Sequence, residues 1–451
     1  MKLIIKELIK FSVPGVISTV AGLMTILVCT RILGDMDKGN YYLLAVCLPV
    51  SYFLLAIYES FKAATITLLA KEADKSSFFI TIIIPLVIAS CLVFIITLLS
   101  FIFLYKEIFY LLKVPSFFYG STYYFCSSLI LANALTGVFY IFLAAFIALK
   151  KPLIAATFSV FISVLICVFT YLFSNVMGYN WVGYIMALVL SSALGIVLSM
   201  FYVQEKFLTL SHSVSLSRTA LINGIILPLK AGFPVFVSYL LILSNLVFIN
   251  IVLVNFGASV LTGFSIAYRI QSVAIIPAIA MGTAMAVLYS RCLYSKNYQT
   301  AEQILLVGFA GCILIYMVIS VFLYINKISI IHFITSDQSV VLPAATYLCY
   351  LSLTYIAMGP FLAYLTMLEQ TGSGKKALMI NSVYFILSMV LGISLTAYFN
   401  NYKYLYLSIA IINVMTFLYV VTMLLIRYLM RSGNKFLNLR RNEKCTITSL
   451  S

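Results

Sequence analysis

A handful of charged residues interrupt the long apolar stretches of this sequence, and they are the first candidates for chemistry. They are Glu59, Lys62, Arg269 and Glu369. A charged side chain at the centre of a membrane costs at least about 2.5–3.5 kcal/mol on insertion scales, so each of the four requires a function or a partner. The carboxylates could bind a proton, a metal cation or an organic cation, and the guanidinium could bind an anion.

Glu59 and Lys62 are three residues apart and therefore lie on one face of a helix, where they can form an ion pair. In the functional interpretation, Glu59 binds a coupling cation or a cationic substrate, and Lys62 tunes its charge. In the alternative, the two residues neutralise each other near the inner membrane interface, with Lys62 extending towards water. The sequence leaves both interpretations open.

Arg269 and Glu369 are assigned mainly structural roles. Arg269, beside Tyr268 and close to Gln271, could attract an anionic group, but contacts with backbone carbonyls of a neighbouring helix are favoured. Glu369 is followed by Gly372 and Gly374, a composition typical of a turn, so we expect its carboxylate to be solvated.

The composition shows which elements must position these residues. The chain has 451 residues, of which 64% are hydrophobic and 9% charged, and its mean hydropathy is +1.13. Soluble domains are typically about a quarter charged, which excludes the soluble classes. The net charge of +16 does not indicate nucleic-acid binding, because the basic residues lie between hydrophobic segments. The chain is therefore predicted to be an all-α, multi-pass membrane protein.

A membrane-spanning helix needs about 20 apolar residues, and this criterion predicts twelve spans. An outer-membrane barrel would instead need alternating segments of about 10 residues. The predicted spans lie near residues 11–33, 43–69, 78–104, 121–148, 153–173, 181–203, 228–254, 260–290, 304–325, 341–367, 378–399 and 404–429. Most Lys and Arg residues flank them on the side of the termini, which predicts cytoplasmic termini in the cell membrane.

The two halves of the chain match at a nearly fixed offset. The paired segments are 9–14 with 229–234, 31–34 with 254–257, and 150–153 with 375–378. Such a repeat predicts two six-helix bundles related by a pseudo-two-fold axis along the membrane normal. The expected domains are an N-terminal lobe (1–203), a cytoplasmic linker (204–224), a C-terminal lobe (225–430) and a basic cytoplasmic tail (431–451).

Prolines and uncharged polar residues within the spans add further candidates. Pro14 and Pro234 lie near the start of each repeat and Pro277 lies within the eighth span, where each could let a helix bend. For Pro14 and Pro234 the alternative is that a first-turn proline simply starts a helix. Asn245, Gln271 and Asn381 could line a cleft between the bundles or only hold helices together.

Several segments resemble the multidrug and toxic compound extrusion (MATE) transporters. The stretch from Phe256 through Tyr268-Arg269 to Pro277 and Met281-Gly282 resembles the region of their seventh and eighth helices. Arg31-Ile32-Leu33-Gly34 resembles the end of their first helix, and 369–376 resembles the glycine-rich turn after their tenth. The stretch 33–42 also resembles lipid-linked oligosaccharide flippases of the same wider superfamily.

The resemblance implies a V-shaped carrier that exchanges Na⁺ or H⁺ for an exported organic solute. It also makes Tyr239, Tyr268 and Tyr364 cleft candidates, because similar carriers use these spans for the solute portal. The family usually has a carboxylate in the middle of helix one or in helices seven and ten, but this sequence has none in 11–33, 229–254 or 341–367. Coupling would therefore depend on Glu59, on neutral oxygens, or would not exist.

The function predicted from these observations is secondary active efflux of small organic, cationic or amphipathic compounds in exchange for H⁺ or Na⁺. The alternatives are a flippase for a polyprenyl-linked oligosaccharide and a membrane scaffold that transports nothing. The sequence contains no P-loop and no metal-ligand spacing, so we expect neither an enzyme nor a bound cofactor. The expected partners are small organic solutes and membrane lipids, with no nucleic acid, and the expected oligomeric state is a monomer.

Overall fold

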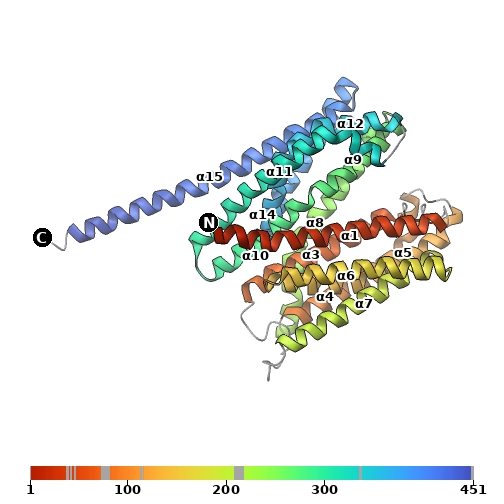
Figure 1. Cartoon of the computed structure of the whole chain (residues 1–451), viewed down its shortest axis with the longest axis horizontal. Coiled ribbons are helices and arrows are strands. Elements are labelled where there is room, and N and C mark those ends of the chain that lie inside the picture. Colours follow the sequence, from red (N-terminus) through yellow and green to blue (C-terminus); the bar gives the residue numbers. More distant parts are fainter. Residues whose placement is uncertain are drawn as a thin grey trace.

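The computed structural model describes residues 2–36, 40, 43–44, 47–72, 82–111, 114, 116–207, 218–334 and 338–447 (Figure 1). In the first half of the chain these form α1 (Lys2–Met36), α3 (Leu48–Glu72), α4 (Ile84–Leu111), η2 (Ser116–Phe118), α5 (Tyr119–Ala148), α6 (Pro152–Thr170), η3 (Tyr171–Val176) and α7 (Asn180–Phe207). The second half forms α8 (Arg218–Val254), α9 (Ala258–Ala274), α10 (Ile276–Tyr294), α11 (Tyr298–Ile334), α12 (Gln338–Leu351), η5 (Ser352–Thr354), α13 (Tyr355–Gln370), α14 (Gly374–Phe399) and α15 (Lys403–Ile447).

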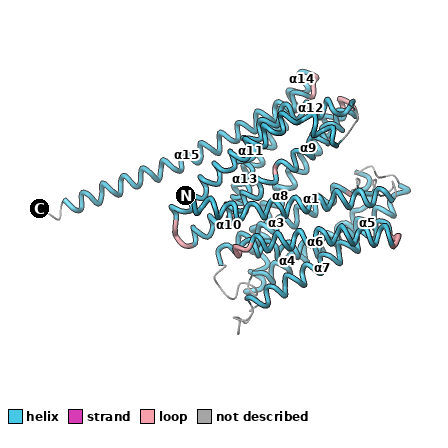
Figure 2. Tube along the Cα trace, in the orientation of Figure 1, coloured by secondary structure: helices cyan, strands magenta, loops and turns pink. Residues whose placement is uncertain are grey.

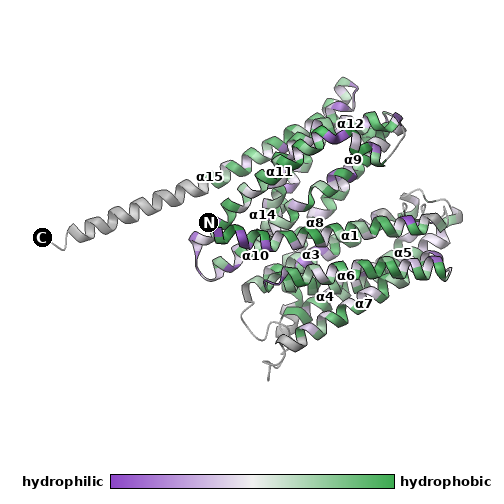
Figure 3. Ribbon diagram, in the orientation of Figure 1, coloured by the Kyte–Doolittle hydropathy of each residue, from purple (hydrophilic) through white to green (hydrophobic). Residues whose placement is uncertain are grey.

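These elements form twelve helical segments that are long and apolar enough to cross a membrane, some of them made of two or three consecutive elements. This confirms the predicted number of spans. Figure 3 shows apolar residues along the lengths of the helices and polar residues mainly at their ends. Several helices run further than predicted: the first span begins at Lys2 and the ninth covers Tyr298–Ile334. Hydropathy marks only the lipid-embedded part of a helix, whereas the backbone hydrogen bonds continue into the polar interface.

The ends of the predicted domains are also helical. α7 continues to Phe207 and α8 begins at Arg218, so helices enter the predicted linker from both sides, and residues 208–217 lie outside the described part. α15 extends into the predicted basic tail as far as Ile447, and residues 448–451 are not described. Figure 2 shows this helix projecting beyond the other helices.

The spanning helices form two groups, which we call the N-lobe (α1 and α3–α7) and the C-lobe (α8–α15). Lys2 and Ile447 lie on the same side of the molecule, here called the terminal side (Figure 1). The two lobes lie close together on the terminal side and diverge towards the opposite side (Figure 1). α1 packs against α10, and α8 packs against α3 as well as α14. The contact between the lobes is therefore made mainly by α1, α3, α8 and α10, with smaller contributions from α4, α11 and α13.

Small residues allow the two lobes to approach closely. A Cβ atom added to Gly232 of α8 would lie 2.8 Å from the carbonyl oxygen of Ser60 in α3. A Cβ atom added to Gly15 of α1 would lie 3.2 Å from the Cβ of Ala280 in α10. Glycine at such contacts lets helix backbones come together, as is common in membrane proteins.

Prolines have different effects in different helices. Pro14 and Pro234 lie inside α1 and α8, well beyond their first turns, so the interpretation of these residues as helix starters is wrong. At Pro277 the eighth span is divided into α9 and α10. The Tyr316 hydroxyl of α11 donates a hydrogen bond to the Ala274 carbonyl (2.8 Å) and accepts one from the Ala278 N–H (3.1 Å). Tyr316 thus bonds to backbone groups on both sides of the break, and the Ala278 N–H also donates to the Ile275 carbonyl (3.1 Å). Such side-chain bonds compensate for the regular helical hydrogen bonds that are missing at a break.

Candidate functional site

Glu59 and Lys62 form the predicted ion pair. The Lys62 Nζ lies 3.0 Å from both carboxylate oxygens of Glu59. The side chains of Lys62 and Glu59 are 18% and 17% exposed, and Glu59 lies near the middle of the span Pro49–Ala70. The pair thus lies nearer to the centre of this apolar segment than to either end. It is held by α3, the N-lobe helix that packs against α8.

Three tyrosines are influenced by the charge of the Glu59 carboxylate. Tyr58 stacks on Tyr140 of α5, with ring centroids 5.0 Å apart and an interplanar angle of 24°. Tyr58, Tyr140 and Tyr239 of α8 all interact electrostatically with Glu59. Tyr239, predicted as a cleft residue, is thus placed beside the predicted ion pair. Three aromatic rings near a carboxylate could contact an organic cation bound by that carboxylate.

Glu369 lies in a different environment from the solvated turn that its sequence neighbours predict. It lies in the last turn of α13 and is only partly exposed, instead of fully solvated in a turn. Its carboxylate interacts with the charge of Glu59, and Tyr239 interacts with both carboxylates. The Ser238 hydroxyl is buried, has no formed hydrogen bond and lies near the Glu369 carboxylate.

A directional property of helices could have identified Glu369. Side chains in an α-helix tilt towards the N-terminus of the helix, so a residue in the last turn of a span points back into that span. The glycines that follow Glu369 correctly indicate a turn, but they give no information about the environment of the Glu369 side chain. Ser238 gave no such signal, because nothing in the sequence specifies that its hydroxyl lies near Glu369.

Glu59, Lys62, Tyr239 and Glu369 together form what we call the inter-lobe cluster. Its members come from α3 of the N-lobe and from α8 and α13 of the C-lobe. With both carboxylates ionised, Lys62 neutralises only one of the two negative charges. Low-dielectric surroundings make an unbalanced charge expensive, so a bound cation or proton would stabilise the cluster. The cluster can therefore act as a cation site that both lobes share.

Arg269 and Tyr268 face the N-lobe further from the terminal side. Tyr52 of α3 interacts electrostatically with Arg269 and with Tyr268, both in α9. Tyr52 precedes Glu59 by seven residues, which places the two residues on one helix face about 10 Å apart along the axis. The Arg269 side chain is exposed. One face of α3 thus meets the C-lobe at two levels. At the outer level Tyr52 lies near Arg269 of α9, and at the inner level Glu59 lies near Glu369 of α13.

Gln271 belongs to a different set of contacts inside the C-lobe. Its Oε1 accepts hydrogen bonds from the hydroxyls of Tyr347 and Tyr355, the latter at 3.2 Å. Thr354, the residue before Tyr355, takes part in a second pair of hydrogen bonds. The Asn413 side chain accepts a bond from the Tyr384 hydroxyl (2.8 Å) and donates one to the Thr354 hydroxyl (2.9 Å). These bonds connect the segments next to the breaks between α9 and α10 and between α12 and α13. They fix the geometry of the broken helices.

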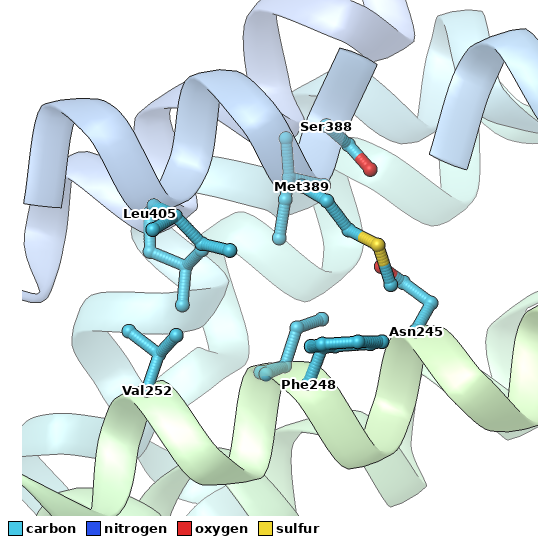
Figure 4. A pocket seen from close by; sticks show the side chains of 9 residues that line it. Asn245, Phe248, Val252, Ser388, Met389 and Leu405 are labelled. Carbon is cyan, nitrogen blue, oxygen red and sulfur yellow. The ribbon is translucent and has the colours of Figure 1, made fainter. Parts of the chain in front are cut away.

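The remaining sequence candidates lie within the C-lobe, apart from the inter-lobe cluster. Asn245 lines a small pocket between α8, α14 and α15, where Figure 4 shows its side chain beside Met389. Asn381 of α14 is buried, and Tyr364 of α13 packs against the hydrophobic core of the C-lobe.

Comparisons with known proteins agree with this architecture. The MatE family model matches residues 234–394. The MATE transporter VcmN of Vibrio cholerae, solved as a mutant, superposes with a TM-score of 0.88 at 15% identity, covering 96% of this chain and 98% of that one. No curated protein sequence matches the chain at a significant level.

Two further solved structures share the fold. A MOP superfamily transporter from Pyrococcus furiosus superposes with a TM-score of 0.82 at 16% identity, covering 94% of this chain and 95% of that one. An outward-facing multidrug resistance MATE family transporter gives a TM-score of 0.82 at 17% identity, with the same coverage. All three are transporters and none is an enzyme.

Proposed function

We propose that this chain is a MATE-type secondary active exporter of small organic cations or amphipathic compounds, because residues 234–394 match the MatE family model and the whole chain shares the fold of MATE transporters. Export is driven by exchange for H⁺ or Na⁺. The observation that supports this proposal best is the inter-lobe cluster, in which Glu59 of one lobe and Glu369 of the other interact around Tyr239.

The charge of the cluster favours a cation as its occupant. Two carboxylates and one ammonium leave a negative charge that a proton, Na⁺ or an organic cation can balance. The rings of Tyr58, Tyr140 and Tyr239 add aromatic surface beside it, which suits organic cations more than inorganic ions. Solute and coupling ion therefore compete for one site, and this competition is the basis of exchange.

The arrangement of the lobes suits alternating access. A site shared by two rigid lobes changes when one lobe moves against the other, because its ligands then separate. We infer cytoplasmic termini from the distribution of Lys and Arg. With that orientation, the lobes diverge towards the outside (Figure 1), and the state described is the one that releases solute and admits the coupling ion.

A lipid-linked oligosaccharide is a poorer substrate for this site. Its pyrophosphate would require several basic residues at membrane depth. The inter-lobe cluster instead has more carboxylates than ammonium groups, and Arg269 contributes one positive charge at a different level of α3.

The proposal is tested by uptake of a fluorescent organic cation into inverted vesicles or proteoliposomes, with and without an imposed H⁺ or Na⁺ gradient. We expect gradient-driven uptake in the natural protein and a loss of at least about tenfold in Glu59→Gln, since about 1.4 kcal/mol of lost coupling is a factor of ten. Glu107→Gln is the matched control, because Glu107 is exposed on α4. Equal uptake with and without a gradient would contradict antiport.

A further inference from the structure

A pocket on the terminal side of the C-lobe is lined by basic residues. It lies between α8 and the turn that joins α13 to α14, and has a volume of about 270 Å³. Its lining residues are Lys230, Ala231, Pro234, Gly372, Ser373, Gly374, Lys375 and Lys376. We call it the lysine pocket. This volume far exceeds the roughly 30 Å³ that one water molecule occupies in the liquid, so the pocket can hold a larger group.

The lysine pocket has a strongly positive lining. Lys230, Lys375 and Lys376 are exposed to solvent, and the lining includes no carboxylate. α14 also begins here: the first hydrogen bonds to the Ser373 carbonyl come from Lys376 (2.9 Å) and Ala377 (3.2 Å). The N–H groups that precede them at the start of a helix have no intrahelical acceptor, and they add to the attraction of the lysines for an anion.

The level of the lysine pocket in the membrane indicates which anion it meets. The α8 span begins at Gly224, six residues before Lys230, and the α14 span begins at Gly374. The three ammonium groups therefore lie at the end of the apolar zone, where the phosphates of membrane lipids are concentrated. Basic pockets between helices at this level suit anionic lipid headgroups.

Contacts around the lysine pocket connect it to the terminal side of the molecule, where the two lobes pack against each other. A Cβ atom added to Gly374 would lie 3.2 Å from Pro234, so the turn packs directly on α8. Gly232, two residues after Lys230, makes the close backbone contact with Ser60 of the N-lobe. An anion held by Lys230 together with Lys375 and Lys376 would fasten the turn to the same part of α8 that contacts the N-lobe.

We propose that the lysine pocket binds the phosphate headgroup of an anionic membrane lipid and thereby stabilises the state in which the lobes are joined on the terminal side. The chemistry is that of a phosphate monoester or diester, and the membrane is its source. A soluble phosphate compound would use the same ligands, and the experiment separates the two.

Native mass spectrometry of the purified full chain tests the binding, with phosphatidylglycerol titrated against a background of phosphatidylcholine. The pocket variant carries Lys230→Gln, Lys375→Gln and Lys376→Gln. The control variant carries Lys2→Gln, Lys6→Gln and Lys10→Gln, which removes the same charge from α1 on the same side. We expect the pocket variant to bind phosphatidylglycerol about tenfold or more weakly than the control. Gel filtration of both variants verifies that they are folded.

Two results would overturn the proposal. The first is equal affinity of the pocket and control variants for phosphatidylglycerol. The second is displacement of the lipid by millimolar glycerol phosphate, which would make the source of the anion soluble. Because the readout is binding and not transport, failure of the exporter proposal would leave this result unaffected. A thermal shift produced by phosphatidylglycerol in the natural protein and lost only in the pocket variant would support the stabilising role.

Discussion

Glu59 and Glu369 interact across the boundary between the two lobes, and Tyr239 of α8 interacts with both of them. Glu59 is paired with Lys62 through both carboxylate oxygens, whereas the polar group near Glu369 is the hydroxyl of Ser238. The two carboxylates therefore differ in their surroundings: Glu59 has a counter-charge on its own helix, whereas the group near Glu369 is an uncharged hydroxyl. Under the exporter proposal, a bound proton or cation would balance Glu369.

Replacing Glu369 with Gln is expected to uncouple transport from pH. The substitution keeps the size of the side chain and removes the charge that Lys62 leaves unbalanced, so the variant no longer needs a cation at the inter-lobe cluster. We expect the pH profile of organic-cation transport in proteoliposomes to flatten and the maximal gradient-driven rate to fall about tenfold. Glu107→Gln provides the control. A Glu369→Gln profile that matches that of the natural protein would assign Glu369 a packing role only.

Replacing Lys62 with Met is expected to destabilise the protein more than replacing the whole ion pair. Lys62→Met leaves Glu59 without its counter-charge in the middle of a span, at a cost of about 1–3 kcal/mol, below the value for a fully buried pair because both side chains are partly exposed. Adding Glu59→Gln removes that charge and should restore much of the stability. Apparent melting temperatures of the two single variants and the double variant complete the cycle. Additive losses would show that the pair is not coupled.

The inter-lobe cluster shows which contacts a sequence can predict. The Glu59–Lys62 pair was predictable because its three-residue spacing is a property of one helix. The proximity of Tyr239 and Ser238 to Glu369 depends on which spans are neighbours. Lipid-facing helices are apolar on most sides, so hydrophobic periodicity, which identifies the buried face of a soluble helix, gives little information here.

The breaks and bends of the helices were predictable only in part. Pro277 was expected to let its helix bend, and the chain divides there into two helices, α9 and α10. Pro14 and Pro234 have the same chemistry, but α1 and α8 continue through them. Gln271 was predicted either to line a cleft or to hold helices together, and the structure shows its hydrogen bonds to Tyr347 and Tyr355. Each outcome depends on neighbouring helices that the local sequence does not specify.

Replacing Gly232 with Ala is expected to loosen the contact between the lobes. The new Cβ would lie 2.8 Å from the Ser60 carbonyl oxygen, a distance at which one of the two backbones must shift. Gly22→Ala is the matched control: no atom lies within 4 Å of its added Cβ, and alanine in an exposed helix is favoured by up to about 1 kcal/mol. We expect the melting temperature to fall for Gly232→Ala and to stay equal or rise for Gly22→Ala. The reverse order would exclude a tight contact at Gly232.

Replacing Tyr316 with Phe is expected to destabilise the break between α9 and α10. The substitution removes the hydroxyl that bonds to both Ala274 and Ala278. The Ala278 N–H keeps its bond to the Ile275 carbonyl (3.1 Å), but the Ala274 carbonyl loses the hydroxyl donor. An unsatisfied buried polar group costs about 1–3 kcal/mol, so the loss should exceed that of an ordinary surface substitution. Tyr294→Phe, at an exposed position of α10, is the control. Hydrogen exchange of the backbone around 274–278 measures the effect locally: faster exchange there in Tyr316→Phe alone is the expected result, and unchanged exchange would mean that Pro277 and its neighbours hold the break without the hydroxyl.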